Sequence, residues 1–130
     1  MKEKILFVNS CVRAENESRT LALAKTALSR LDGDIEEIRL ADANLKPLDA
    51  AGLAKRAESA EKNDFSDPVY DCAKQFAACD TVVIAAPFWD YSFPAFLKIY
   101  VESLCVGGLT FLYGSDGVPI SYCRAKKLIY

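Results

Sequence analysis

The chain contains two short uncharged runs, Ile5–Val8 and Thr81–Ala86, in which apolar residues follow one another with little interruption. The first run stops at Asn9 and the second at Pro87. An apolar run bounded by turn-forming residues is typical of a strand whose two faces are both covered. Strands of this kind favour a parallel sheet with helices packed on both faces.

A helix is predicted after the first strand, because apolar residues recur there at helical spacing. These residues are Leu21, Ala24, Leu28 and Leu31. Ser18 is the expected N-cap of this helix, and Asp32-Gly33 is its expected stop. Residues 35–40 then predict a second strand, which is more polar and is therefore expected near an edge of the sheet.

Residues 41–67 carry Pro47, Gly52 and mixed charges, and they predict a loop with a short, mostly solvated helix. A better helix is predicted over residues 68–79 by four apolar residues on one face. These are Val69, Cys72, Phe76 and Cys79. The two cysteines of this face are interpreted as small core residues.

Beyond the second apolar run, Pro94 is expected to begin a helix that reaches about Leu104. Residues 109–122 predict an irregular or hairpin excursion around Ser115-Asp116-Gly117. Residues 126–130 begin a further strand. The alternation of strands and helices predicts a single α/β domain with a doubly wound parallel sheet.

Composition excludes several functional classes. The chain is 52% hydrophobic and 26% charged, which is the balance of a globular protein, and its net charge of −2 argues against a nucleic-acid surface. No apolar run is long enough to span a bilayer, and the first residues lack a cleavage site, so a cytoplasmic protein is expected.

Cysteine and histidine usage narrows the chemistry. The five cysteines are odd in number and show no CxxC spacing, so neither a disulfide framework nor a zinc ribbon is predicted. Histidine is absent, which excludes Ser-His-Asp hydrolases, Cys-His proteases and His-ligated metal sites. The chemistry is therefore expected to come from a bound cofactor, with no metal site and no catalytic side chain.

The loop after the first strand, residues 9–20, offers hydroxyl and amide groups ahead of a helix N-terminus, which suits a phosphate. Simple helix capping is the alternative interpretation. The loop contains neither GxGxxG nor GxxxxGK[ST], so a Rossmann or P-loop nucleotide site is not predicted. Cys11 lacks the Arg six residues later that a tyrosine phosphatase requires, since Glu17 stands there.

The loop after the second apolar run, residues 87–93, holds four aromatic residues that could stack on a flat heteroaromatic ring. Phe93 and one other aromatic residue are expected to pack against the following helix. Trp89 and Tyr91 are expected to be the exposed ones.

Together these segments resemble the FMN-dependent NADH-azoreductase and NAD(P)H quinone oxidoreductase family. The stretch Ala86–Pro94, followed by Leu97-Lys98 and Tyr100, is similar to the family signature APMYNFxxPxxLKxY. A second stretch is similar to the family segment AGVTFxY…G…GKK. It comprises Gly107-Gly108-Leu109-Thr110-Phe111, Tyr113, Gly117 and Ala125-Lys126-Lys127.

The resemblance implies a flavodoxin-like fold, FMN as cofactor, and hydride transfer from NAD(P)H through flavin to a quinone or azo compound. It implies a homodimer with the flavin at the subunit interface. It assigns the phosphate to Ser10, Asn16, Glu17 and Ser18, and the isoalloxazine edge to Phe88, Trp89, Asp90 and Tyr91. Because the family continues into a third flavin loop, a helix and a fifth strand, four of the five strands are expected here.

Two residues depart from the family pattern. Asp90 replaces an Asn beside the ring, so its charge is expected to disfavour the anionic reduced flavin. Glu17 lies in the phosphate cluster, where Arg13 and Arg19 could offset it. Two alternatives remain: a flavodoxin-type electron carrier, and a non-catalytic remnant that folds through dimerisation. Cys11 is either a redox-sensitive thiol or a small loop residue.

Overall fold

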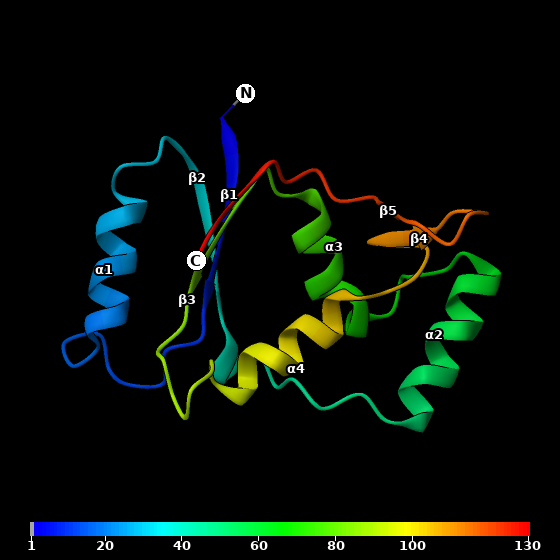
Figure 1. Ribbon diagram of the computed structural model, residues 1–130, viewed down its shortest axis with the longest axis horizontal. Helices are drawn as coiled ribbons and strands as arrows, with labels where there is room; N and C mark the ends of the chain where they lie inside the picture. The colour runs from blue at the N-terminus through cyan, green and yellow to red at the C-terminus, as the bar shows by residue number, and fades with distance from the viewer. Residues whose placement is uncertain (1) are drawn as a thin grey trace.

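The computed structural model describes residues 2–130 and contains a four-stranded parallel sheet. Its strand order is β2-β1-β3-β6, and Figure 1 shows the strands between helices on both sides. The strands are β1 (Glu3–Asn9), β2 (Gly33–Arg39), β3 (Thr81–Ala85) and β6 (Lys127–Ile129). The predicted α/β class and parallel sheet are confirmed. The chain turns one way from β1 to β2 and the other way to β3, so the winding reverses at β1.

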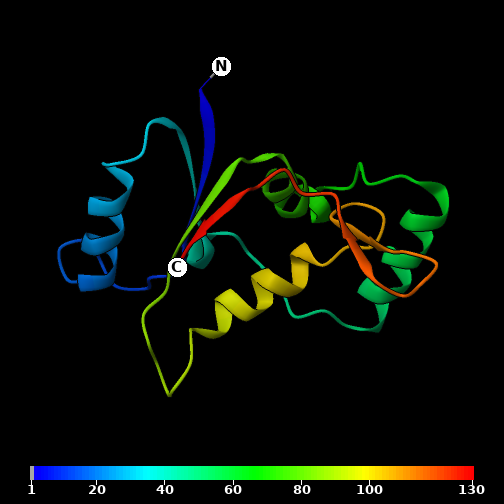
Figure 2. The same cartoon turned by 45° about the horizontal axis from the view of Figure 1, so that its top comes forward.

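Helices cover the two faces of the sheet (Figures 1 and 2). Helix α1 (Arg19–Leu28) lies on one face, and α3 (Asp71–Ala78) and α4 (Ala95–Leu104) lie on the other. Because side chains alternate along a strand, β1 contributes to two separate cores. Ile5 and Phe7 pack with residues of α1, whereas Leu6 and Val8 pack with residues of α4.

Strand β2 is one of the two edge strands, as its polar sequence predicts, and β6 is the other. Strand β2 pairs with β1 along its whole length, from Gly33 opposite Glu3 to Arg39 opposite Asn9. None of its residues is fully buried. Its charged side chains protect the open edge against pairing with another chain.

Helix α1 begins as predicted but ends early. The Ser18 hydroxyl accepts a hydrogen bond from the backbone N–H of Leu21 at 3.1 Å, which confirms the N-cap. The expected stop at Asp32-Gly33 is wrong, because the helix ends at Leu28 and Gly33 opens β2. A Cβ at Gly33 would lie 2.5 Å from the carbonyl oxygen of Glu3, so glycine allows the close strand pairing there.

The segment 41–67 forms helix α2 (Ala50–Lys62) after a short 3-10 helix, η1 (Leu40–Asp42). With 13 residues, α2 is longer than the short helix expected, although none of its residues is buried, as predicted. Figures 1 and 2 show it outermost on its side of the sheet. The Arg56 guanidinium fastens it to α4 by donating to the carbonyl oxygens of Glu102 at 2.7 Å and Cys105 at 3.0 Å.

The helix predicted over residues 68–79 is divided. A 3-10 turn, η2 (Pro68–Tyr70), precedes α3. The prediction that Val69 shares the apolar face is therefore wrong: the tighter turn leaves Val69 exposed and buries Tyr70. Phe76 and Cys79 do pack in the core, as expected.

The last part of the chain follows the predictions closely. Helix α4 begins one residue after Pro94 and ends at Leu104. The expected hairpin is confirmed as β4 (Phe111–Tyr113) and β5 (Pro119–Ser121), with Gly117 at a φ of 79° in its turn. Among residues 2–130, no helix has both the length and the apolarity that a bilayer span requires.

Candidate functional site

The carboxyl ends of β1 and β3 lie side by side, with Asn9 opposite Ala85. In open α/β sheets, ligands bind at the point where the winding direction reverses, which here is between these two strands. A cavity of about 450 Å³ opens there between the loop after β1 and the loop after β3. It is lined by Cys11, Val12, Arg13, Glu17, Ser18, Arg19, Thr20, Pro87 and Trp89. The two loops singled out from the sequence therefore meet in one site.

The loop after β1 is anchored to β3 at its start. The backbone N–H and the hydroxyl of Ser10 both donate to the carbonyl oxygen of Ala85, at 3.0 and 2.6 Å. Ser10 is buried and does not line the cavity, so its hydroxyl is engaged inside the protein. Cys11 is also buried, and its thiol lies 4.0 Å from the same carbonyl oxygen. This burial favours the interpretation of Cys11 as a small loop residue.

The N-terminus of α1 forms one wall of the cavity. Glu17 and Ser18 close a turn there, since both backbone N–H groups donate to the carbonyl oxygen of Ala14. Arg19 and Thr20 are the first two residues of the helix, where backbone N–H groups have no partner within the helix. The helix dipole adds partial positive charge at this end. This wall is thus suited to an anion.

Charged side chains reinforce that character. Two guanidinium groups, Arg13 and Arg19, line the cavity against one carboxylate, Glu17. Within residues 2–130, none of these three side chains forms an ion pair, so both cations are available to a ligand. Asn16 lies exposed in the same loop but outside the cavity lining.

The loop after β3 is a tight two-residue turn. Trp89 and Ser92 exchange two backbone hydrogen bonds of 2.8 Å. Between them, Asp90 and Tyr91 have φ values of 49° and 64°, which is the combination of a type I′ turn. Asp90 is a residue commonly found at the first of these positions, but Tyr91 occupies the second, where glycine is usual, so the turn carries backbone strain at Tyr91.

The aromatic residues of this loop face solvent to different degrees. Tyr91 is 94% exposed, and its ring meets the edge of Phe88 with the centroids 6.3 Å apart. Trp89 is 42% exposed and lines the cavity. The predicted exposure of Trp89 and Tyr91 is confirmed. The expectation that Phe93 and one other aromatic residue pack against α4 is wrong, since Phe93 remains 38% exposed and Phe88 75% exposed.

Of the eight site residues named from the sequence, the structure places three in the cavity lining: Glu17, Ser18 and Trp89. Phe88, Asp90 and Tyr91 lie in the adjoining turn, Asn16 lies beside the α1 wall, and Ser10 lies beneath it. The sequence interpretation gave Thr20 and Pro87 no ligand role. Their positions, at a helix start and directly after a buried strand, are the signal that could have identified them.

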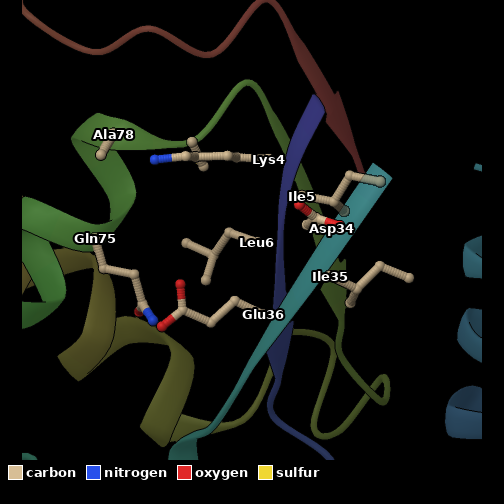
Figure 3. A pocket seen from close by; sticks show the side chains of 9 residues that line it. Lys4, Ile5, Leu6, Asp34, Ile35, Glu36, Gln75 and Ala78 are labelled. Carbon is tan, nitrogen blue, oxygen red and sulfur yellow. The ribbon is translucent and has the colours of Figure 1, made fainter. Parts of the chain in front are cut away.

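Another cavity, of about 240 Å³, lies between α3 and the first half of β1 and β2 (Figure 3). Lys4, Leu6 and Glu36 point from the sheet toward α3, and Gln75 points back from the helix toward Glu36. This depression lies away from the carboxyl ends of the strands, where ligands of such sheets bind. It is the weaker candidate.

A third cavity, of about 470 Å³, lies beneath α2 and is lined by the loop 43–49 and by residues of α2, η2, α3 and α4. Two of its three cationic groups already have partners, and the third is Lys46. Lys55 is paired with Asp67, and Arg56 is bonded to backbone carbonyls. It therefore offers a charged ligand less than the cavity at β1 and β3.

Three thiols away from the site are not activated as nucleophiles. Burial raises the pKa of Cys72, Cys79 and Cys123, so these groups stay protonated near neutral pH. Burial also raises the pKa of the Tyr100 hydroxyl well above its ordinary value. Within residues 2–130, no group of acidic or cysteine side chains is arranged to hold a metal ion.

The sequence matches one protein family and several proteins of known name. A family model described as "Flavodoxin-like fold" matches residues 3–130. An FMN-dependent NADH:quinone oxidoreductase of Clostridium acetobutylicum is 34% identical over 98% of this chain and 65% of the relative. One from Clostridium perfringens is 30% identical over 98% of this chain and 66% of the relative. The chain thus spans just under two thirds of the length of these relatives.

Among solved structures, an FMN-dependent NADH-azoreductase from Bacillus anthracis in complex with FMN superposes with a TM-score of 0.73. The match covers 95% of this chain and 66% of that protein, at 20% identity. At this identity the likeness establishes the fold. The family model and this superposition both identify a flavodoxin-like fold.

Proposed function

Because this chain belongs to the flavodoxin-like fold family, we propose that it is an FMN-dependent oxidoreductase. In this proposal it passes hydride from NAD(P)H through the flavin to a quinone or azo compound. The observation that carries the proposal is the cavity at the carboxyl ends of β1 and β3, where a basic helix N-terminus faces Trp89. Sequence relatives named FMN-dependent NADH:quinone oxidoreductases support the choice of chemistry.

The residues present fit a phosphate at one end of the cavity. Arg13 and Arg19 supply two guanidinium groups that form no ion pair within residues 2–130, and the start of α1 supplies backbone N–H groups and the Thr20 hydroxyl. Charge-assisted hydrogen bonds of this kind are about twice as strong as neutral ones. The carboxylate of Glu17 would repel the phosphate, but the two guanidinium groups leave the wall with a net positive charge.

The other end fits a flat ring. The Trp89 indole lines the cavity, and Phe88 and Tyr91 stand exposed on the same turn. Aromatic faces of this size stack on flat ligands without needing a fixed pattern of hydrogen bonds. The basic wall at the start of α1 thus suits the phosphate of a flavin nucleotide, and the aromatic wall at Trp89 suits its ring.

The bound flavin would supply the hydride chemistry itself. The part of the protein is to hold the phosphate, to support the ring and to set the charge around it. No side chain is required as a nucleophile, which agrees with the protonated state of Cys72, Cys79 and Cys123. Asp90, exposed in the turn beside Trp89, is the acidic group placed to influence the ring electrostatically.

The proposal includes a homodimer in the cytoplasm. The exposed side chains of Phe88 and Tyr91 give the turn an apolar surface that a second subunit could cover, as aromatic residues are enriched at interfaces. All five cysteines are free thiols, which fits a reducing compartment.

The direct test is a fluorescence titration of FMN with the purified 130-residue chain. Saturable quenching at micromolar protein supports the site, and NADH-driven reduction of a quinone then separates an oxidoreductase from an electron carrier. A folded chain that leaves FMN fluorescence unchanged would overturn the proposal and favour a non-catalytic member of the fold.

A further inference from the structure

Asn9, the last residue of β1, is 1% exposed and makes two side-chain hydrogen bonds. Its Oδ1 accepts from the backbone N–H of Cys11 at 3.0 Å, and its Nδ2 donates to Oε1 of Glu37 on β2 at 2.9 Å. Asn9 and Glu37 belong to neighbouring strands, yet neither lines the cavity at β1 and β3. Asn9 and Glu37 therefore support the start of the loop after β1 without lining the cavity.

Glu37 fixes which way the Asn9 amide points. An ionised carboxylate only accepts hydrogen bonds, so the amide must turn its NH₂ group toward Glu37. That orientation leaves Oδ1 facing the N–H of Cys11, which needs an acceptor. The opposite orientation would bring two donors together at Cys11 and two acceptors together at Glu37. The carboxylate on β2 therefore selects the amide orientation that turns the chain at Ser10 and Cys11.

The turn set by Asn9 leads directly into the cavity wall. Ser10 fastens the same point to β3 through the carbonyl oxygen of Ala85, and Cys11, Val12 and Arg13 then line the cavity. We propose that Asn9 and Glu37 form a positioning pair that fixes the backbone of residues 11–13 for the phosphate of the flavin. This inference rests on the proposed function. In this arrangement the carboxylate of Glu37 lies near the loop after β1, but its charge is not directed into the cavity.

Charged groups from three elements surround the pair. A space of about 300 Å³ beside Asn9 and Glu37 is lined by Glu15 of the loop, Lys25 of α1 and Arg39 of β2. Glu15 is paired with Lys25, and Arg39 is paired with Asp42. The carboxylate of Glu37 has no ion pair among the described residues, so its side-chain hydrogen bond is the one from Asn9.

The test compares Asn9→Asp, Glu37→Gln and the double variant by FMN titration. Asn9→Asp sets two carboxylates against each other and removes the donor, so FMN affinity should fall about tenfold at pH 8. Relative to wild type at the same pH, this loss should shrink toward pH 5 as the pair takes up a proton. In the double variant, the new amide on β2 can donate to the new carboxylate at the end of β1, so the hydrogen bond forms again with its charge exchanged. Affinity should then return to within about threefold of wild type.

Rescue by the double variant shows that the loss in Asn9→Asp arises at the contact with Glu37, because two independent changes would not restore affinity. Asn44→Asp, which adds the same charge in the loop after η1, is the matched control. Wild-type affinity in Asn9→Asp, or no recovery in the double variant, would overturn the proposal that Asn9 and Glu37 position residues 11–13.

Hydrogen exchange of the Cys11 amide keeps the inference separate from the proposed function. The amide should be protected in wild type, exposed in Asn9→Asp and protected again in the double variant. If wild type does not bind FMN, the proposed function fails, and the exchange pattern still decides whether the pair fixes the loop. If FMN binds while Cys11 exchanges equally in all variants, the pair fails and the function stands.

Discussion

The loop after β1 is held by contacts with two other strands, whereas the loop after β3 is held mainly by its own turn. Asn9 and Ser10 connect the first loop to Glu37 and Ala85, which lie 28 and 75 residues away in the chain. The second loop closes on itself through Trp89 and Ser92 and presents Tyr91 to solvent. One wall of the cavity is therefore preorganised by the sheet, and the other is a strained, exposed turn.

This difference has a consequence for ligand binding. A backbone fixed by hydrogen bonds to the sheet loses little freedom when a ligand arrives, so its N–H contacts carry little ordering cost, and only the exposed side chains of Arg13 and Arg19 must be ordered on this wall. A wall made of exposed aromatic side chains must order them on binding, and part of each contact is offset. We therefore expect the phosphate wall, formed by the loop after β1 and the start of α1, to contribute more affinity for each residue than the aromatic wall at Trp89.

The largest effect is expected on the phosphate wall. Replacing Arg13 and Arg19 together by Gln should weaken FMN binding about a hundredfold, because each charged hydrogen bond from these exposed side chains should contribute about 1.4 kcal/mol, at the low end of the usual range. Affinity for riboflavin, which lacks the phosphate, should change by less than about twofold. Parallel titrations with the two flavins measure this, and Arg30→Gln, which removes an exposed arginine beyond the other end of α1, controls for the loss of positive charge. An equal loss for both flavins would show that the arginines shape the cavity without contacting the phosphate.

The next effect is expected on the aromatic wall. Trp89→Ala should weaken FMN and riboflavin equally, by about tenfold, since stacking contributes about 1–3 kcal/mol. Tyr91→Ala should have a smaller effect, because Tyr91 belongs to the same turn but does not line the cavity, and Tyr113→Ala in the hairpin of β4 and β5 is the control for loss of an exposed aromatic ring. If Tyr91→Ala had the larger effect, the ring would lie outside the cavity, over the tip of the turn.

A smaller effect is expected on the turn itself. Tyr91 has a φ of 64°, a conformation that costs a residue with a Cβ about 1–2 kcal/mol. Tyr91→Gly should relieve that strain, and after the added chain entropy of glycine the protein should gain about 0.5 kcal/mol of stability. Urea unfolding measures the change. A loss of stability would mean that the ring contact with Phe88 outweighs the strain.

The contrast between the walls also shows what local sequence patterns can predict. The strands and the hairpin were predictable, because the apolar runs and the Ser115-Asp116-Gly117 turn are patterns contained within a few neighbouring residues. The end of α1 was not, since Gly33 resembles a helix stop but serves the close pairing with Glu3. Val69 was misplaced because helical spacing does not distinguish a 3-10 turn from an α-helix.

The candidate site divides in the same way. Its location followed from two strands that end in polar or aromatic loops, and Ser18 and Trp89 were found on that basis. The role of Ser10 was not accessible, because its hydroxyl bonds to a carbonyl 75 residues away. The bond between Asn9 and Glu37 likewise depends on the register of β1 and β2, which no local pattern reveals.

The smallest effect is expected from the charge of Asp90. The family resemblance predicts that Asp90→Asn raises the flavin reduction potential, because removing a negative charge favours the anionic reduced ring. Asp90 is exposed and does not line the cavity, so solvent screens its charge strongly. The shift should therefore be only about 10 mV, which for a two-electron couple is about 0.5 kcal/mol. Titration against a dye of known potential measures it, with Asp116→Asn in the distant hairpin as control. An unchanged or lower potential would contradict this assignment. A shift several times larger would show that the strained turn folds inward over the ring when flavin is bound, so that the exposed wall becomes as ordered as the anchored one.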